Sequence, residues 1–245
     1  DLGAINRSGS HDHFSQSCQG AIGATLADTW AVLRAIADRA GGDPGFVGLT
    51  GDVDFKARNK PAKLGILGTY GWKLTSEGAR KAFAAAKQRL QMSGIDLRER
   101  ADDADIEAAE QALSDALDLT MSINAWEGRW PLNTYSDLDP TKLSQSARDR
   151  LVTAEKMTQK QFAELLARRE TVRATYAKAA AKYDALITVG ACGAAPVGLG
   201  TTGNTAMNVS ASLLGCPALT IPVLADEGLP LGLQVIGRAL DEATV

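Results

Sequence analysis

The alternation of apolar and polar residues predicts helices and strands in turn over the first half of the chain. Three segments place apolar residues three and four positions apart, as on one face of a helix, whereas two short apolar runs have the length of strands. The predicted helices cover residues 21–40, 75–92 and 105–126, and the predicted strands cover residues 63–67 and 95–97. An order in which strands and helices alternate favours a sheet with helical cover.

The second half predicts a helical layer followed by strands. Residues 141–182 carry apolar residues spaced as helix faces, and they predict two helices with a break near Thr158. Residues 185–189 form a bare apolar run, as expected for a strand buried on both faces. Two more strands, expected to be bounded by Pro222 and Pro230, and a connecting turn are predicted at residues 218–221, 232–236 and 225–228. The predicted fold is α/β, with a mixed β-sheet core covered by helices in a single domain.

Composition narrows the classes of partner. The 245 residues are 45% apolar, and 26 Lys and Arg face 29 Asp and Glu, for a net charge of −3. No apolar stretch approaches the ~20 residues of a membrane span, and no basic patch suggests nucleic acid, so neither partner is expected. Cys18, Cys192 and Cys216 are too few for a disulfide framework or a four-cysteine zinc site, which favours a cytoplasmic location.

A glycine motif at residues 198–203 matches the dinucleotide fingerprint GxGxxG, and Asp226 follows at the distance of a ribose-binding acid. A true fingerprint begins directly at the end of a strand, because the turn must deliver a helix N-terminus to the pyrophosphate. Here the predicted strand ends at Val189 and Pro196 intervenes. A glycine-rich loop that passes close to another part of the protein is the alternative, and no cofactor is expected.

The run from Ser10 to His13 contains the residue types of a hydrolytic triad and two metal ligands. Neighbouring residues rarely converge on one point, because a nucleophile, its base and the orienting acid come from separate elements. A polar turn is the alternative, and no metal is expected. Cys192, on the loop after strand 185–189, is a candidate pocket wall, and Trp126 belongs to an aromatic group that shapes either a pocket mouth or a lid on the core.

The last third of the chain carries two linked motifs. Residues 213–222 have the form L-x-G-x-P-A-x-x-x-P, and residues 228–237 have the form G-L-P-x-G-x-Q-x-x-G. In this order the two motifs resemble the C-terminal end of the amidase signature family, and residues 1–45 are compatible with the same family. Within the first motif, Gly215 is expected to adopt a backbone conformation that is costly for other residues, and Pro217 is expected to fix the start of the next strand.

The resemblance implies hydrolysis of a carboxamide to carboxylate and ammonia by a Ser–cis-Ser–Lys triad. That triad lies in a Gly/Ser-rich block which these 245 residues do not contain, so the chain resembles the C-terminal portion of an amidase and is expected to be inactive alone. Its expected contribution is the substrate pocket. The pocket residues that the resemblance suggests are Cys192, Gly193, Thr205, Asn208 and Trp126.

Two other functions are alternatives. One is a protein similar to the amidotransferases that act on misacylated tRNA together with partner subunits, and the other is a dinucleotide-binding oxidoreductase that uses residues 198–203. The expected partner is a small-molecule amide, and a homodimer is left open.

Overall fold

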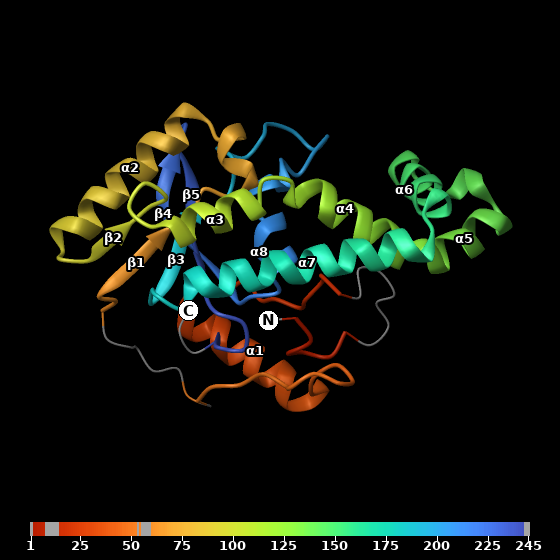
Figure 1. Cartoon of the computed structure of the whole chain (residues 1–245), viewed down its shortest axis with the longest axis horizontal. Coiled ribbons are helices and arrows are strands. Elements are labelled where there is room, and N and C mark those ends of the chain that lie inside the picture. Colours follow the sequence, from red (N-terminus) through yellow and green to blue (C-terminus); the bar gives the residue numbers. More distant parts are fainter. Residues whose placement is uncertain (1, 8–14, 53, 55–59, 243–245) are drawn as a thin grey trace.

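A five-stranded sheet forms the centre of the protein, for which a computed structural model describes residues 2–7, 15–52, 54 and 60–242 (Figure 1). The strand order is β2-β1-β3-β5-β4. β1 runs parallel to β2 and β3, whereas β5 runs antiparallel to β3 and β4. The strands are β1 (Lys63–Ile66), β2 (Asp96–Arg98), β3 (Ala185–Val189), β4 (Ala218–Asp226) and β5 (Leu229–Ile236). The predicted mixed sheet is confirmed.

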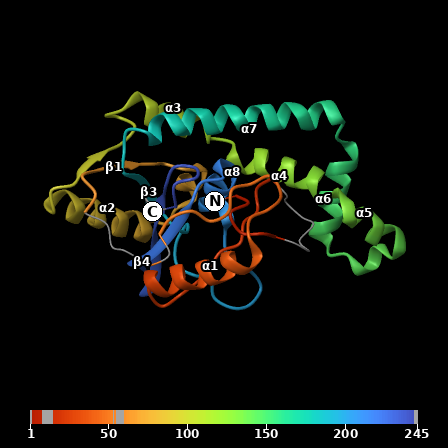
Figure 2. The same ribbon diagram turned by 90° about the horizontal axis from the view of Figure 1, so that it is seen from below.

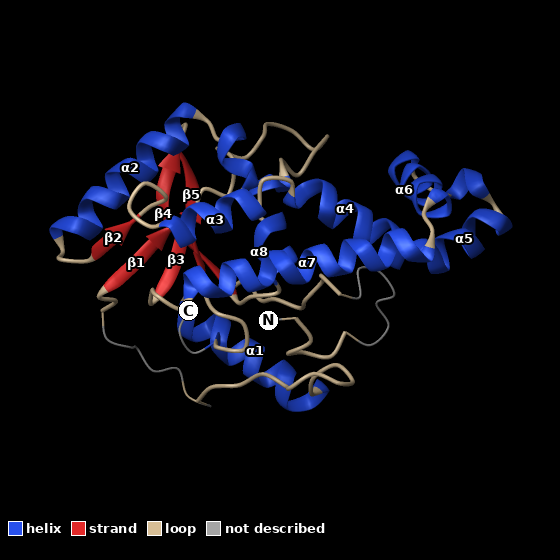
Figure 3. Ribbon diagram, viewed as in Figure 1, coloured by secondary structure: helices blue, strands red, loops and turns tan. Residues whose placement is uncertain are grey.

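Helices cover both faces of the sheet (Figure 3). α2 packs on one face, α3, α7 and α8 pack on the other, and α5 and α6 lie beyond the end of the sheet (Figure 2). The α-helices are α1 (Leu26–Ala40), α2 (Glu77–Met92), α3 (Ala104–Ala112), α4 (Ala116–Glu127), α5 (Arg129–Leu138), α6 (Gln145–Lys156), α7 (Gln159–Ala180) and α8 (Val209–Leu214). Two short 3₁₀ helices, η1 (Tyr70–Leu74) and η3 (Thr205–Met207), follow β1 and precede α8. None of these described helices has the length and apolar character needed to cross a membrane.

The core is divided by the sheet into two layers of apolar side chains. Leu64, Phe83 and Val189 are among those that pack between the sheet and α2. Leu186 and Tyr176 belong to the layer between the sheet and helices α3, α4, α7 and α8. Burying a side chain of this size contributes about 1.5–3 kcal/mol, so both layers fix the orientation of the strands.

Side-chain caps set the helix starts that the sequence predicted. The Ser76 hydroxyl accepts from the Ala79 amide at the start of α2. At the predicted break, Thr158 and Gln161 form a capping box that starts α7. The two helices predicted in residues 141–182 are confirmed as α6 and α7, and the second half of α7 is part of the core.

Two helix predictions need correction. The segment predicted as one helix over residues 105–126 is two helices, because a turn at residues 113–115 separates α3 from α4. The first helix starts at Leu26 rather than at Ala21, because the Thr25 hydroxyl accepts from the Asp28 amide and caps the helix there.

The β4–β5 hairpin is longer than predicted and includes both prolines. Pro222 lies inside β4, where the register shifts, and an edge strand tolerates proline because its outer amides need no partner. The turn consists of Glu227 and Gly228, both with positive φ (52° and 78°), which suits a two-residue hairpin turn. Before the hairpin, Gly215 ends α8 in the left-handed conformation (φ 68°), which confirms the expectation for this glycine.

Candidate functional site

The loops that follow β1 and β3 meet at the carboxyl ends of these neighbouring strands. Connections from this point lead to opposite sides of β1, which is where open α/β sheets leave a crevice for a ligand. The Cys192 carbonyl accepts from the Ser76 amide (2.7 Å), and the Cys192 thiol lies 3.9 Å from the Gly71 carbonyl oxygen. A Cβ on Gly71 would collide with Met207. The loop after β3 is therefore packed between η1 and η3.

Asp226, at the end of β4, holds this loop against helix α2. Its Oδ2 accepts from the Ser76 hydroxyl (2.6 Å) and from the Ala194 amide (3.0 Å), and only 6% of the residue is exposed. Gly193 and Gly78 lie so close to this carboxylate that a Cβ on either would press against it. The candidate pocket residue Gly193 thus provides room for a buried structural contact.

A polar row crosses the opposite face of the sheet. Thr188 on β3 and Thr220 on β4 are both in register with Gln234 on β5. Gly190 and Gly232 lie beside this row, and the amide of Gly190 donates to the carbonyl of Gly232 (2.7 Å). Since neither glycine has a side chain, the surface next to the polar row is low. We call Thr188, Thr220 and Gln234 the polar row.

Asn208 connects the polar row to the start of α8. The side-chain amide of Gln234 donates to Oδ1 of Asn208 (3.3 Å), and Asn208 itself is exposed. Gln234 is 3% exposed, and its Oε1, like Oγ1 of Thr188, has no hydrogen-bond partner among the described residues. Buried polar atoms normally have partners, so this row has hydrogen-bonding capacity left for a polar ligand.

The five candidate pocket residues fall into three places. Cys192 and Gly193 contact the start of α2, whereas Asn208 contacts the polar row and Thr205 is exposed at the start of η3. The backbone of Met207 approaches the Cys192 thiol, so the first two places adjoin. Convergence of the Cys192 and Asn208 side chains on one cavity stays a prediction.

Trp126 lies apart from the other candidates. Its ring stacks on Phe162 of α7 (5.1 Å between centroids, 16° between planes), and the Arg129 guanidinium lies 4.4 Å from the Trp126 ring centroid. Both neighbours belong to the helices on one side of the sheet. Trp126 therefore packs between helices α4 and α7, away from the strand-end loops.

Neither cysteine near the strand ends has the environment of a nucleophile. Burial raises the pKa of the Cys192 thiol, although the nearby backbone of Met207 opposes this. Burial also raises the pKa of Cys216 to about 11, although the Arg173 guanidinium favours the thiolate. The thiolate is the reactive form, so both residues are protonated near neutral pH and act as packing groups.

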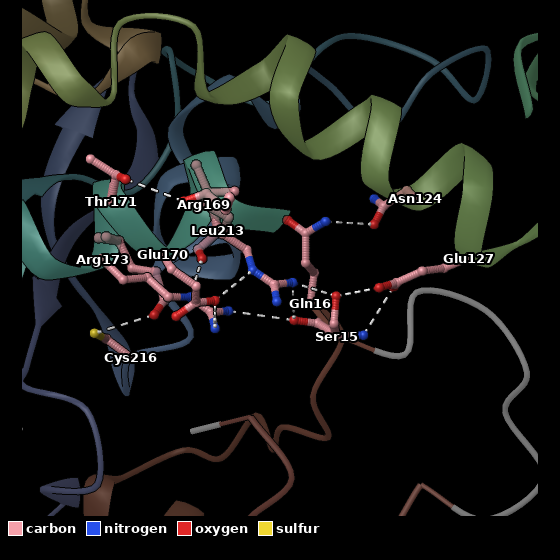
Figure 4. Close-up of polar contacts among 12 residues, drawn as sticks. Ser15, Gln16, Asn124, Glu127, Arg169, Glu170, Thr171, Arg173, Leu213 and Cys216 are labelled. Carbon is pink, nitrogen blue, oxygen red and sulfur yellow. Dashed lines mark hydrogen bonds and ion pairs between the residues drawn. The ribbon is translucent and has the colours of Figure 1, made fainter. Parts of the chain in front are cut away.

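An arginine network fixes the early part of the chain to the helices behind α8 (Figure 4). Arg169 of α7 is buried and donates to the Ser15 hydroxyl, which in turn donates to the Glu127 carboxylate. One turn further along α7, the Nε of Arg173 donates to the Leu213 carbonyl at the end of α8 (2.9 Å). The network thereby positions α8, which begins next to Asn208.

The glycine motif at residues 198–203 does not have dinucleotide-binding geometry. β3 ends at Val189, the motif is an exposed loop, and α8, the next α-helix, has six residues. Asp226 is buried against Ser76 and Ala194, so it does not face a ribose. The run from Ser10 to His13 lies outside the described residues.

Sequence reasoning missed the polar row and Asp226. Thr188 and Gln234 are polar residues inside otherwise apolar strands, and that break in pattern is a usable signal. The role of Asp226 had no local signal, because its partner Ser76 is 150 positions away.

Comparison with known proteins identifies the family. A profile of the Amidase family matches residues 3–245. The chain belongs to the amidase family. Two curated relatives are A-type components of glutamyl-tRNA(Gln) amidotransferase. The protein from Zymomonas mobilis subsp. mobilis is 58% identical over 43 residues, and that from Syntrophomonas wolfei subsp. wolfei is 50% identical over 42 residues. Each match covers 17% of this chain and 9% of the relative.

Solved structures share the amidase fold over about half of their length. An inhibitor-bound complex, described as revealing the origins of an s-triazine catabolic enzyme, matches with a TM-score of 0.72 and 20% identity over 99% of this chain and 55% of that chain. A peptide amidase in complex with chymostatin matches with a TM-score of 0.63 and 20% identity over 99% and 55%. The 6-aminohexanoate cyclic dimer hydrolase with substrate matches with a TM-score of 0.65 and 17% identity over 89% and 51%. At these identities the likeness establishes the fold.

Proposed function

We propose that this amidase-family chain takes part in hydrolysis of a carboxamide to a carboxylate and ammonia, and that its polar row faces the substrate. The family match over residues 3–245 is the observation that carries this proposal. Gln234 and Asn208 present side-chain amides, which can donate to a carbonyl and accept from an amide nitrogen. Substrate amide groups have the same two needs.

Catalysis needs groups that the described part of the chain does not supply. An amide is a poor electrophile, so the nucleophile needs a base and the oxyanion needs fixed donors. Within the described residues, no serine hydroxyl is hydrogen-bonded to a lysine amine. The chain alone is therefore expected not to turn over amides, since loss of a whole triad removes about 10⁶-fold in turnover.

The test is ammonia release from a panel of short aliphatic and aromatic amides. Residues 1–245 are compared with the product of the complete reading frame that contains them. We expect turnover only from the complete product. Robust turnover by residues 1–245 that is abolished by Cys192→Ala would show that the nucleophile is in this chain.

The polar row is tested in whichever product is active. Gln234→Met keeps the volume and removes the amide, so it should raise KM for the amide by about tenfold, the cost of one lost hydrogen bond to a buried site. Gln91→Met on the exposed surface of α2 is the matched control. Unchanged KM in Gln234→Met with normal folding would remove the polar row from the substrate site.

Membership of an amidotransferase complex is the second candidate, and the local identity of 58% to the relative from Zymomonas mobilis subsp. mobilis favours it. Such a protein would work with partner subunits on misacylated tRNA. Co-purification of further proteins and glutamine-dependent amidation of glutamyl-tRNA would distinguish it from a free-standing amidase.

We further propose a cytoplasmic location and leave the homodimer to measurement. All three cysteines are unpaired, as in a reducing compartment. Light scattering on the eluting protein measures the mass of the particle and so decides between a monomer and a dimer.

A further inference from the structure

A cleft of about 490 Å³ opens at the carboxyl ends of β1 and β2, between helices α2 and α3. Its size is in the range of small-molecule sites, and open α/β sheets bind ligands beyond the carboxyl ends of their strands. We call it the β1–β2 cleft. The residues proposed above to face an amide do not line it.

One wall of the cleft is apolar and rigid. Trp72 of η1 and Phe83 of α2 both line it, and their rings pack edge to face (5.4 Å between centroids, 69° between planes). Phe83 is 2% exposed, which fixes this wall to the core below α2. A flat or aliphatic body could pack against such a wall without ordering mobile side chains.

Two cations beside this wall have no carboxylate partner among the described residues. Arg80 donates through one terminal nitrogen to the carbonyls of Trp72 and Lys73, which leaves its other donors available. The amine of Lys73 lies 4.2 Å from the Tyr70 ring centroid and forms no ion pair there. Both side chains line the cleft. This end of the cleft therefore carries uncompensated positive charge next to apolar surface.

The opposite end of the cleft limits how much negative charge it accepts. Glu99 is paired with Lys87 (3.0 Å), and Glu110 accepts from the Gly68 amide (2.6 Å) and lies 3.3 Å from Arg100. Two carboxylates in the lining disfavour a doubly charged phosphate. A single negative charge placed at the Arg80 end would avoid them.

From this arrangement we propose that the β1–β2 cleft binds a monocarboxylate with an apolar or aromatic body. The carboxylate pairs with Arg80 and Lys73, and the body packs on Trp72 and Phe83. The proposal does not depend on the amide chemistry proposed above, because its residues and its test are separate.

The test is calorimetric titration of the full chain with phenylacetate, hexanoate, phenylacetamide and inorganic phosphate. We expect saturable binding of both carboxylates, binding at least about tenfold weaker for the neutral amide and for phosphate, and weakening with added salt. Equal binding of phenylacetate and phenylacetamide, or no binding of phenylacetate in the millimolar range, would overturn the proposal.

Variants then locate the bound carboxylate. Arg80→Gln should weaken phenylacetate about tenfold, and Lys73→Gln, which leaves the backbone contacts of Arg80 in place, should weaken it in the same direction. The control is Lys81→Gln, whose side chain is 76% exposed, bridges to Glu77 and does not line the cleft. Unchanged affinity in both Arg80→Gln and Lys73→Gln would place any bound carboxylate elsewhere.

Discussion

Helices α1 and α7 lie on opposite sides of the molecule, and both have apolar residues at helical spacing (Figure 2). α7 buries Val172, Tyr176 and Ala179 against the sheet and its neighbours. In α1 only Ala37 is buried, and Leu26 and Ile36 are 39% and 41% exposed. The same pattern therefore has two different outcomes.

Polar contacts hold α1 where apolar contacts hold α7. The Asp43 carboxylate, just after α1, accepts from the Arg7 backbone amide (2.8 Å) and pairs with the Arg7 guanidinium (2.5 Å). The Asn6 amide donates to the Gly41 carbonyl, and the Trp30 indole donates to the Asp52 carbonyl. Periodicity thus identifies an apolar face, whereas the presence of a packing partner decides whether it is buried.

The largest expected effect is at the centre of the α7 interface. Tyr176 is buried, and its hydroxyl donates to the Gly237 carbonyl (2.9 Å). Tyr176→Ala should lower the free energy of unfolding by about 3–5 kcal/mol through lost burial and a cavity. Urea denaturation followed by circular dichroism measures this change. Tyr176→Phe, which loses only the hydrogen bond, should cost about 1 kcal/mol.

Removing the polar anchor of α1 should have a smaller, local effect. Arg7→Ala leaves the mostly buried Asp43 carboxylate without its ion pair and should cost about 1–3 kcal/mol. Hydrogen exchange should become faster in residues 26–43, while the amides of α7 keep their protection. If α7 exchanged equally faster, the two helices would form one cooperative unit and the contrast would fail.

A third variant examines how the α7 side depends on pH. Asp103 caps α3, and its pKa is held well below the usual range by its hydrogen bond to Lys182, which follows α7, with a further contribution from Tyr183. A lowered pKa stabilises the fold above the unfolded value of 3.8, and this stability is lost as pH falls below it. Asp103→Asn should cost about 1–2 kcal/mol at pH 7. The difference from the parent should shrink below about pH 4 in denaturation series.

The smallest expected effect is on the exposed face of α1. Ile36→Gln should change the free energy of unfolding by less than about 0.5 kcal/mol, because its side chain is already in contact with water. Thermal unfolding of the chain gives the measurement. A loss above about 1 kcal/mol would show that something covers this face in solution.

Local signals explain which parts of the fold could be predicted. The buried run of β3 and the capping box of α7 act within a few residues, so the sequence alone indicates them. α8 was not predicted because six residues are too short to show a helical period or to be stable alone. The turn between α3 and α4 was missed because apolar spacing continues across it.

The candidate site was only partly predictable for a related reason. Asn208 was found through the family motif, but its partner Gln234 depends on the register of β3 with β5. That register pairs Thr188 with Gln234 across many intervening residues, and no local pattern encodes it. Long-range pairing, rather than residue type, is what the sequence leaves open.

The Asp226 carboxylate also has a consequence for the order of folding. It joins the end of β4 to the start of α2 and to the loop after β3, and the Ser76 contact spans 150 positions. Contacts between distant positions form only after large chain loops have closed, and they slow folding. The loop that carries Cys192 therefore gains its support last, once the C-terminal hairpin has docked. A nascent chain would hold its sheet and helices before it held a finished ligand crevice.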